Sequence, residues 1–339
     1  SFLSQDQVYV FLSQNGSTAL EVALKMAFQF WYNQGITHKK KVIAIRGAYH
    51  GDTFGSMSVG ERGAFTVPFS PYLFDVEYID FPTSSNEENV ITQFNDLLRA
   101  GEVGAFVYEP LAQAASGMRI YSAAFLDTLI REAISHDVIC IADEVFTGFG
   151  RTGKLFASEY LTNDPDIIAI SKGITGGTMA LGVTSCSEKI VSAFQSNANE
   201  KTFFHGHSYT ANPIACAAAN ASFELLLQEE CQRQIKMIGQ QHVMFKQKIE
   251  WNENIKEIRC LGTIFALELK THQETSYFNE IRKKILPYFL SKNILLRPLG
   301  NVIYILPPYV IREHELDQIY DSIEEFLVEI KSYRQSPDA

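Results

Sequence analysis

The sequence predicts an α/β protein with a large domain on a mostly parallel central sheet and a smaller α+β domain at the C-terminal end. Short apolar segments alternate with helical patterns over the first 250 residues. Strands are expected at 8–13, 41–46, 76–79, 103–108, 138–142, 166–170 and 180–186, and helices at 19–31, 122–135, 214–227 and 231–250. Strands without polar alternation are typical of a parallel sheet that helices cover on both faces.

The order of elements changes after residue 250. Strands near 264–269, 294–297 and 302–306 alternate there with helices at 274–290 and 312–330. A chain of 339 residues is long enough for about two domains. We therefore expect a large domain over residues 1–250 and a small C-terminal domain over residues 251–339.

Composition excludes several classes of protein. A hydrophobic content of 46% predicts a folded chain, and the net charge of −10 argues against a nucleic-acid-binding surface. No apolar run approaches the ~20 residues that a membrane-spanning helix needs. The five cysteines are scattered without C-x-x-C spacing, which favours free thiols, no metal site and a cytoplasmic location.

The predicted strands of the large domain run into polar residues that are suited to chemistry. The residues in these places are Gly16 and Ser17, Tyr49, Glu109, Asp143 and Lys172. One such residue is commonplace, because a lysine is usually a solvated surface residue and a serine before a helix is usually a cap. The carboxyl ends of parallel strands, however, meet at one edge, where ligands bind. The whole set therefore predicts a single site.

Pyridoxal phosphate requires this set of groups. A lysine amine forms a Schiff base with its aldehyde, and an aspartate beside the ring nitrogen keeps that nitrogen protonated. Its phosphate needs N–H donors at a helix N-terminus, which the Gly16-Ser17 turn offers, and an aromatic ring such as that of Tyr49 stacks on the cofactor. The strand-end residues thus predict a pyridoxal-phosphate enzyme.

A competing motif lies at residues 148–153, which match G-x-G-x-x-G after a predicted strand. In a dinucleotide-binding fold these glycines would leave the strand directly and open a long helix. Here residues 144–147 intervene, and the residues after Gly153 start a helix poorly. A nicotinamide-dependent oxidoreductase stays open as an alternative, whereas a Walker A loop is excluded because its pattern is absent.

The residues around Asp143 and Lys172 resemble the signature of the class III aminotransferases. Residues 141–153 read Ile-Ala-Asp-Glu-Val-Phe-Thr-Gly-Phe-Gly-Arg-Thr-Gly, and Ser171-Lys172-Gly173 lies further along the chain. The resemblance spans nearly the whole chain. It implies a fold-type I, pyridoxal-phosphate-dependent transaminase that works as a homodimer, with active sites at the subunit interface.

Shorter segments are similar to those of the biotin-biosynthesis members of this class, namely 49–55, 176–179, 212–222, 297–300 and 304–309. This resemblance implies conversion of 8-amino-7-oxononanoate to 7,8-diaminononanoate with S-adenosylmethionine as amino donor. The implied mechanism is a ping-pong sequence through the pyridoxal and pyridoxamine forms of the cofactor. Lysine stays open as the donor. A class III enzyme for omega-amino acids or ornithine and a catalytically silent scaffold stay open as well.

The resemblance also implies roles for individual residues. Lys172 would hold the cofactor and move the proton, while Asp143 would pair with the ring nitrogen. The further cofactor-binding residues are Gly16, Ser17, Tyr49, Glu109 and Ser208. Ser208 would reach the phosphate of the neighbouring subunit's cofactor, and it stands where the family usually has threonine. The substrate-binding residues are Arg297 for the carboxylate, with Tyr304, Asp52, Tyr49, Gly206 and Arg151.

The beginning of the chain departs from the family pattern. The first residue is Ser1 rather than methionine, and the first predicted strand begins at residue 8. The family carries a segment before this strand that contributes aromatic residues to the substrate pocket. We expect that N-terminal segment to be missing from this chain.

Overall fold

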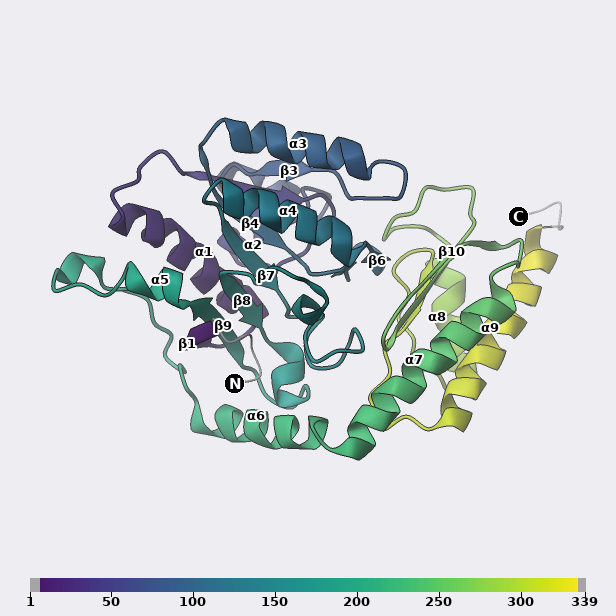
Figure 1. Ribbon diagram of the computed structural model, residues 1–339. Helices are drawn as coiled ribbons and strands as arrows, with labels where there is room; N and C mark the ends of the chain where they lie inside the picture. Colours follow the sequence, from purple (N-terminus) through teal and green to yellow (C-terminus); the bar gives the residue numbers. More distant parts are fainter. Residues whose placement is uncertain (1–6, 335–339) are drawn as a thin grey trace. The chain divides into compact units, whose positions relative to one another are not determined.

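The computed structural model describes residues 7–334, which form two compact units (Figure 1). The first unit contains the chain up to Ala114, together with Tyr121–Phe149 and Lys154–Leu225. The second unit contains Ala115–Ile120, Gly150–Gly153 and the chain from Leu226 onward. Within the described residues, no helix combines the length and the apolar character that a membrane span requires.

This division differs from the predicted boundary at residue 250. Helix α7 (Glu229–Ile249) lies in the second unit, because its side chains Ile238, Phe245 and Ile249 pack into the core of that unit. The sequence pattern predicts an apolar face along the 21 residues of this helix. It does not predict whether that face packs into the core of the first unit or of the second.

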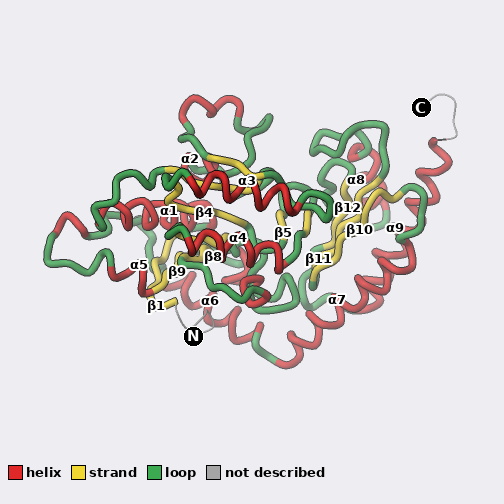
Figure 2. The backbone as a smooth tube through the Cα atoms, turned by 45° about the horizontal axis from the view of Figure 1, so that its top comes forward, coloured by secondary structure: helices red, strands yellow, loops and turns green. Residues whose placement is uncertain are grey.

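A seven-stranded sheet forms the centre of the first unit (Figure 2). Its order is β1 (Gln7–Ser13), β9 (Gly182–Ser187), β8 (Ile167–Ile170), β7 (Ile139–Asp143), β4 (Val103–Tyr108), β2 (Lys41–Ile45) and β3 (Glu77–Ile79). The strands from β8 to β3 pair in parallel, whereas β9 runs antiparallel to both of its neighbours. The prediction of a mostly parallel central sheet is confirmed.

Helices cover both faces of this sheet. Helix α1 (Gly16–Asn33) packs its buried side chains against Ala105 and Val107 of β4 and their counterparts on β2, β7 and β8. On the opposite face, Phe94 of α3 (Glu87–Arg99) meets Phe106 of β4 with ring centroids 4.9 Å apart. Helix α4 (Ala123–Ser135) lies beside α3 (Figure 1). Burial on both faces explains why these strands read as unbroken apolar runs.

The register of the parallel strands brings their carboxyl ends together. Tyr108 of β4 pairs with Ala142 of β7, and Asp143 pairs with Ala169 of β8. Glu109 directly follows Tyr108, and Lys172 follows the last residue of β8 by two positions. The three charged residues therefore lie at one edge of the sheet.

The second unit holds a three-stranded antiparallel sheet in the order β10 (Ile255–Leu261), β11 (Ile264–Leu269) and β12 (Val302–Ile305). Its helices are α7, α8 (Arg282–Ser291) and α9 (Glu313–Arg334), and their apolar faces share one core with the sheet. Strand β10 was not among the strands predicted from the sequence. The strand predicted at 294–297 is absent from the sheet, and the helix predicted from 274 begins at Arg282.

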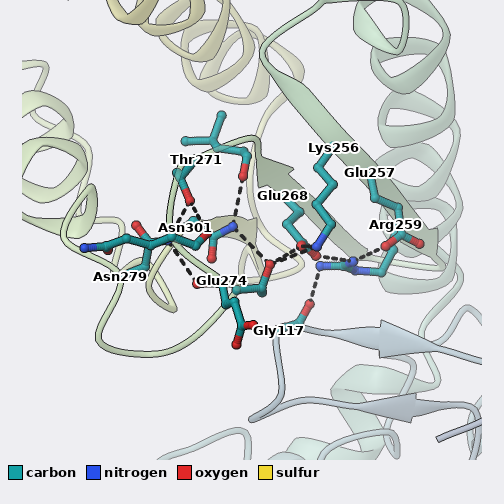
Figure 3. A network of polar contacts seen from close by, with 12 residues as sticks. Gly117, Lys256, Glu257, Arg259, Glu268, Thr271, Glu274, Asn279 and Asn301 are labelled. Atoms are coloured by element: carbon teal, nitrogen blue, oxygen red, sulfur yellow. Dashed lines mark hydrogen bonds and ion pairs between the residues drawn. The ribbon is translucent and has the colours of Figure 1, made fainter. Parts of the chain in front are cut away.

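A buried arginine ties this sheet to a loop of the second unit (Figure 3). Arg259 of β10 is 7% exposed, and it donates to Glu268 of β11 at 2.7 Å and to the carbonyl oxygen of Gly117 at 2.9 Å. Glu268 also accepts from Lys256 at 2.7 Å. Burial alone would raise the pKa of Glu268, but the Lys256, Thr275 and Arg259 hydrogen bonds outweigh burial and lower it.

We expect Arg259→Ala to lower the free energy of unfolding by about 3 kcal/mol, because it leaves the Glu268 carboxylate without the buried one of its two cations. Urea unfolding followed by tryptophan fluorescence and circular dichroism measures the change. Arg233→Ala is the matched control, since Arg233 pairs with Glu230 on the exposed face of α7 and its loss should have little effect. Equal effects of the two changes would contradict the assignment.

Candidate active site

Lys172 occupies an unusual backbone position at the end of β8. It is the first residue of the short helix η3 (Lys172–Thr175), and its φ angle of 44° lies in the left-handed region. This conformation costs a residue with a side chain about 1–2 kcal/mol, and such strain concentrates at functional sites. The side chain is exposed, with Nζ 5.9 Å from the ring centroid of Phe146. The ammonium group is therefore presented outside the core.

The turn after Lys172 is fixed by close packing. Gly173 lies so near Phe149 that an added Cβ would come within 2.8 Å of the Phe149 Cβ, so only glycine fits there. The Ser171 hydroxyl donates to the Leu181 carbonyl oxygen at 2.6 Å, and the backbone N–H of Gly177 donates to the carbonyl oxygen of Lys172 at 3.2 Å. These contacts hold the lysine backbone in its strained conformation.

Asp143 and His50 form a buried pair at the end of β7. The Asp143 carboxylate is 4% exposed and lies 2.7 Å from Nδ1 of His50, which is also 4% exposed. Burial by itself lowers the pKa of His50, but the hydrogen bond and the negative charge of Asp143 outweigh it, so the pKa is raised. The second ring nitrogen, Nε2, is buried without a hydrogen-bond partner among the described residues. Asp143 is thus the group that orients this ring.

Glu109 lies next to this pair in a buried position of its own. Burial, more than any other cause, raises the pKa of Glu109 from its ordinary 4.5 to about 7, while His50 opposes the shift and Asp143 adds to it. The carboxylate accepts from the backbone N–H of Tyr49 at 3.1 Å and of Ala114 at 3.3 Å. Glu109 therefore changes charge near neutral pH while it anchors the loop that carries Tyr49 and His50.

The loop after β2 packs directly on the start of α1. Gly51 has a φ angle of +123°, and a Cβ there would overlap the Ser17 side chain. The backbone N–H of Asp52 donates to Ser17 Oγ at 3.3 Å, and the Tyr49 hydroxyl donates to Asp52 Oδ2 at 3.0 Å. Burial and the Asp52 hydrogen bond raise the pKa of Tyr49 to about 12. Tyr49 therefore stays a neutral phenol at the strand edge.

The N-terminus of α1 supplies unused N–H donors. Asn15 caps the helix by accepting from the Thr18 N–H at 3.0 Å, and the Thr18 hydroxyl accepts from the Asn15 N–H at 2.9 Å. This capping box leaves the N–H groups of Gly16 and Ser17, in the first turn, without partners inside the helix. A Cβ on Gly16 would lie 2.7 Å from Val145 Cγ1, so the turn closely approaches the residues after Asp143.

Three of the predicted substrate residues belong to the second unit. Arg297 is exposed and donates from Nη2 to the Tyr277 hydroxyl at 2.9 Å, while Tyr304 lies on β12. Arg151 donates from Nη1 to Thr263 Oγ1 and to the Pro307 carbonyl oxygen, each at 3.1 Å. The guanidinium of Arg151 thus serves contacts within its own unit.

Gly206 and Ser208 lie in the exposed segment between η4 (Asn199–Lys201) and α6 (Pro213–Leu226) of the first unit. Within the described residues, no hydrogen bond joins either of them to Lys172 or Asp143. Their predicted roles involve substrate and a partner subunit's phosphate, so these roles stay predictions.

His50 is the site residue that sequence analysis did not select. The sequence offered a signal, because His50 follows Tyr49 in the polar loop after a predicted strand. An isolated histidine has no distinguishing pattern, however, and its contact with Asp143 joins residues 93 positions apart. The tertiary structure was needed to identify that contact.

The donor set fits pyridoxal phosphate. A protonated ring nitrogen would meet the buried Asp143 carboxylate, and a phosphate would meet the N–H groups of Gly16 and Ser17. The exposed amine of Lys172 would hold the aldehyde end, and Tyr49 offers an aromatic face at the same edge.

Comparisons with known proteins agree with this fit. The family pattern described as Aminotransferase class-III matches residues 2–327. The adenosylmethionine-8-amino-7-oxononanoate aminotransferase of Synechococcus elongatus is 43% identical over 329 residues, covering 95% of this chain and 77% of that protein.

Solved structures give the same result. The crystal structure of adenosylmethionine-8-amino-7-oxononanoate aminotransferase from Methanocaldococcus jannaschii has a TM-score of 0.87 at 32% identity, over 95% of this chain and 76% of its own. An amine transaminase from an uncultivated Pseudomonas species, in the PLP-bound (internal aldimine) form, has a TM-score of 0.89 at 27% identity, over 96% of this chain and 77% of its own.

Fold and site together define a pyridoxal-phosphate-dependent enzyme of fold type I. The chain belongs to the class III aminotransferases, since that family matches nearly all of it. It is therefore a transaminase, and the hypothesis of a nicotinamide oxidoreductase is wrong. Residues 148–153 do not open a long helix, because the next helical element is η2 (Ala157–Tyr160), of four residues.

The raised pKa of Glu109 predicts a pH dependence of stability. An acid whose pKa is higher in the folded than in the unfolded state stabilises the fold at low pH, and this contribution is lost as the pH rises through the folded value of about 7. Because of this group, the free energy of unfolding of the wild type should fall by on the order of 3 kcal/mol between pH 4.5 and 8. We expect this fall to be absent in Glu109→Gln. Urea unfolding of the cofactor-free protein across this range measures it. Parallel pH profiles of the wild type and the variant would contradict the prediction.

Proposed function

We propose that this chain transfers an amino group from S-adenosylmethionine to 8-amino-7-oxononanoate, in biotin biosynthesis. The observation that carries the proposal is the 43% identity over 95% of the chain with a relative named for this reaction. Relatives from Geobacter sulfurreducens and Anoxybacillus flavithermus have the same name at 38% and 35% identity. Those names describe the relatives, and the assignment to this chain is our inference.

Lys172 and Asp143 carry the chemistry in this proposal. When bound, pyridoxal phosphate draws electrons from the carbon beside the amine, so that this carbon loses a proton. The Lys172 amine accepts that proton and returns it at the neighbouring position, since it is the exposed base at the end of β8. Asp143 holds the positive charge on the ring nitrogen, and His50 holds Asp143 at 2.7 Å.

Other residues of the first unit bind and orient the cofactor. The N–H groups of Gly16 and Ser17 bind its phosphate, because they lie at the positive end of the α1 dipole. Tyr49 would stack on the ring, and Glu109 would hold the region around the ring hydroxyl. Ser208 would bind the phosphate of the neighbouring subunit's cofactor with its hydroxyl, in a proposed homodimer with active sites at the subunit interface.

Arg297 binds the carboxylate that both substrates carry. Its planar guanidinium is exposed and matches the two oxygens of a carboxylate with paired hydrogen bonds. Tyr304, Asp52, Tyr49, Gly206 and Arg151 are the proposed neighbours of the substrate. The five cysteines are free thiols within the described residues, which supports our proposal of a cytoplasmic location.

An amine-donor comparison tests the proposed reaction. We expect the pyridoxal-phosphate-loaded protein to convert 8-amino-7-oxononanoate to 7,8-diaminononanoate with S-adenosylmethionine, measured by mass spectrometry of the product. Lysine, ornithine and an omega-amino acid replace this donor in matched reactions. If the diamine forms with lysine but not with S-adenosylmethionine, the amino donor is lysine. If ornithine or the omega-amino acid is turned over with other acceptors, and 8-amino-7-oxononanoate is not converted with any donor, the proposed reaction is refuted.

Replacement of the predicted catalytic lysine tests the site itself. We expect Lys172→Ala to lower kcat by at least about 100-fold, because the amine that moves the proton is lost. The absorbance of the lysine-bound cofactor should disappear as well. Lys154→Ala is the matched control, because Lys154 donates to the Glu159 carbonyl oxygen at 2.7 Å, away from the strand ends. Full activity of Lys172→Ala would remove the assignment.

A further inference from the structure

The Arg297 guanidinium has a defined partner within the second unit. Its Nη2 group donates to the Tyr277 hydroxyl at 2.9 Å, although both side chains lie at the surface of the unit. An arginine side chain in solvent samples many rotamers, and fixing it costs conformational entropy. A hydrogen bond at one edge of the guanidinium therefore restricts Arg297 before any ligand arrives.

Backbone packing places Tyr277 at this position. Gly300 lies three residues after Arg297, and its φ angle of +61° favours glycine. A Cβ on Gly300 would overlap the carbonyl oxygen of Ser276 and lie 3.3 Å from the Tyr277 Cα. The segment that follows Arg297 thus lies directly against the backbone that carries Tyr277.

Buried amides fasten the loop before Tyr277 to the sheet of the second unit (Figure 3). Asn301 is 1% exposed and donates from Nδ2 to the Leu269 carbonyl oxygen at 2.9 Å. Asn279 is 2% exposed and donates to Thr271 Oγ1 at 2.8 Å. Asn301 also donates to Thr275 Oγ1 at 3.4 Å and so links the loop of residues 270–281 to the sheet, whereas Asn279 joins two parts of that loop to each other. Tyr277 therefore projects from a fixed support.

The charges around Tyr277 favour an acceptor role for its hydroxyl. The guanidinium carbon of Arg282 lies 5.3 Å from the Tyr277 ring centroid, so two cations face this phenol. The Arg297 hydrogen bond and charge, followed by Arg282, lower the pKa of Tyr277. A phenol oxygen with this polarity is a strong acceptor for one N–H of Arg297.

We propose that Tyr277 is a positioning residue for substrate recognition, which holds one edge of the Arg297 guanidinium so that its remaining N–H groups bind a carboxylate. This inference rests on the proposed function, in which Arg297 binds the substrate carboxylate. A guanidinium has five N–H donors, and Tyr277 occupies one of them. The specificity that follows is for substrates with a carboxylate, against amines of the same length that lack one.

Ligand binding to Tyr277→Phe tests the role without turnover. The probes are nonanoate, a nine-carbon monocarboxylate, and nonanamide, its uncharged analogue, titrated calorimetrically into the cofactor-loaded protein. We expect the Kd of nonanoate to rise roughly 3- to 10-fold, the effect of one arginine that is no longer pre-organised. Nonanamide binding should not change. The KM for 8-amino-7-oxononanoate should rise by a similar factor with little change in kcat.

Two further variants make the outcomes distinct. Tyr288→Phe is the matched control, since the Tyr288 hydroxyl of α8 donates to Glu325 of α9 in an exposed contact and should not affect either probe. Arg297→Ala should weaken nonanoate binding more than Tyr277→Phe does. If Arg297→Ala weakens it but Tyr277→Phe leaves it unchanged or strengthens it, the role of Tyr277 is refuted and the proposed function stands.

The remaining outcomes are equally decisive. If neither Arg297→Ala nor Tyr277→Phe changes nonanoate binding, the carboxylate role of Arg297 fails and the inference fails with it. If the wild type does not convert 8-amino-7-oxononanoate but Tyr277→Phe weakens nonanoate binding, the proposed reaction fails and the positioning role stands.

Discussion

The candidate site depends on the buried contact between the Asp143 carboxylate and the His50 ring. A buried carboxylate is costly unless it is paired and hydrogen-bonded. His50 supplies that partner at 2.7 Å, and the backbone N–H of Val145 donates to the other oxygen at 3.0 Å. The same interaction fixes the loop that carries Tyr49. Together with the hydrogen bond from the Tyr49 N–H to Glu109, this buried contact sets a carboxylate and an aromatic face in place at one strand edge.

Close backbone contacts then bring the other groups to the same edge. Gly16 allows the start of α1 to approach Val145, and Gly51 allows the loop after β2 to pack on Ser17. Each contact leaves no room for a side chain. Close packing therefore holds the start of α1 against the residues after Asp143, and the Tyr49 loop against Ser17, which organises the site before its ligand binds.

The second unit positions the residues that we propose for substrate binding. Its core buries the apolar faces of α7, α8 and α9, and its sheet supports the turn with Arg297 and the loop with Tyr277. The first unit thus carries the groups proposed for cofactor and proton transfer, and the second carries the group proposed for the substrate carboxylate. Each unit organises its own set with contacts internal to that unit.

The parallel sheet, the helices that cover it and the residues at its strand ends could be predicted from the amino-acid sequence alone. Strands buried on both faces leave continuous apolar runs, and Lys172 and Asp143 stand at the ends of such runs. Strand β10 was missed because Lys256, Glu257 and Arg259 interrupt its apolar residues. The strand predicted at 294–297 does not form, and the next residue, Pro298, has no N–H to donate to a sheet.

The contacts between residues far apart in the sequence could be learned only from the folded chain. The pairing of His50 with Asp143, the position of Tyr277 on Arg297 and the membership of α7 in the second unit all join segments whose sequences show no mark of one another. The physical reason is that the spacing of apolar residues indicates which face of a segment is buried. Which other segment covers that face depends on the packing of the whole chain.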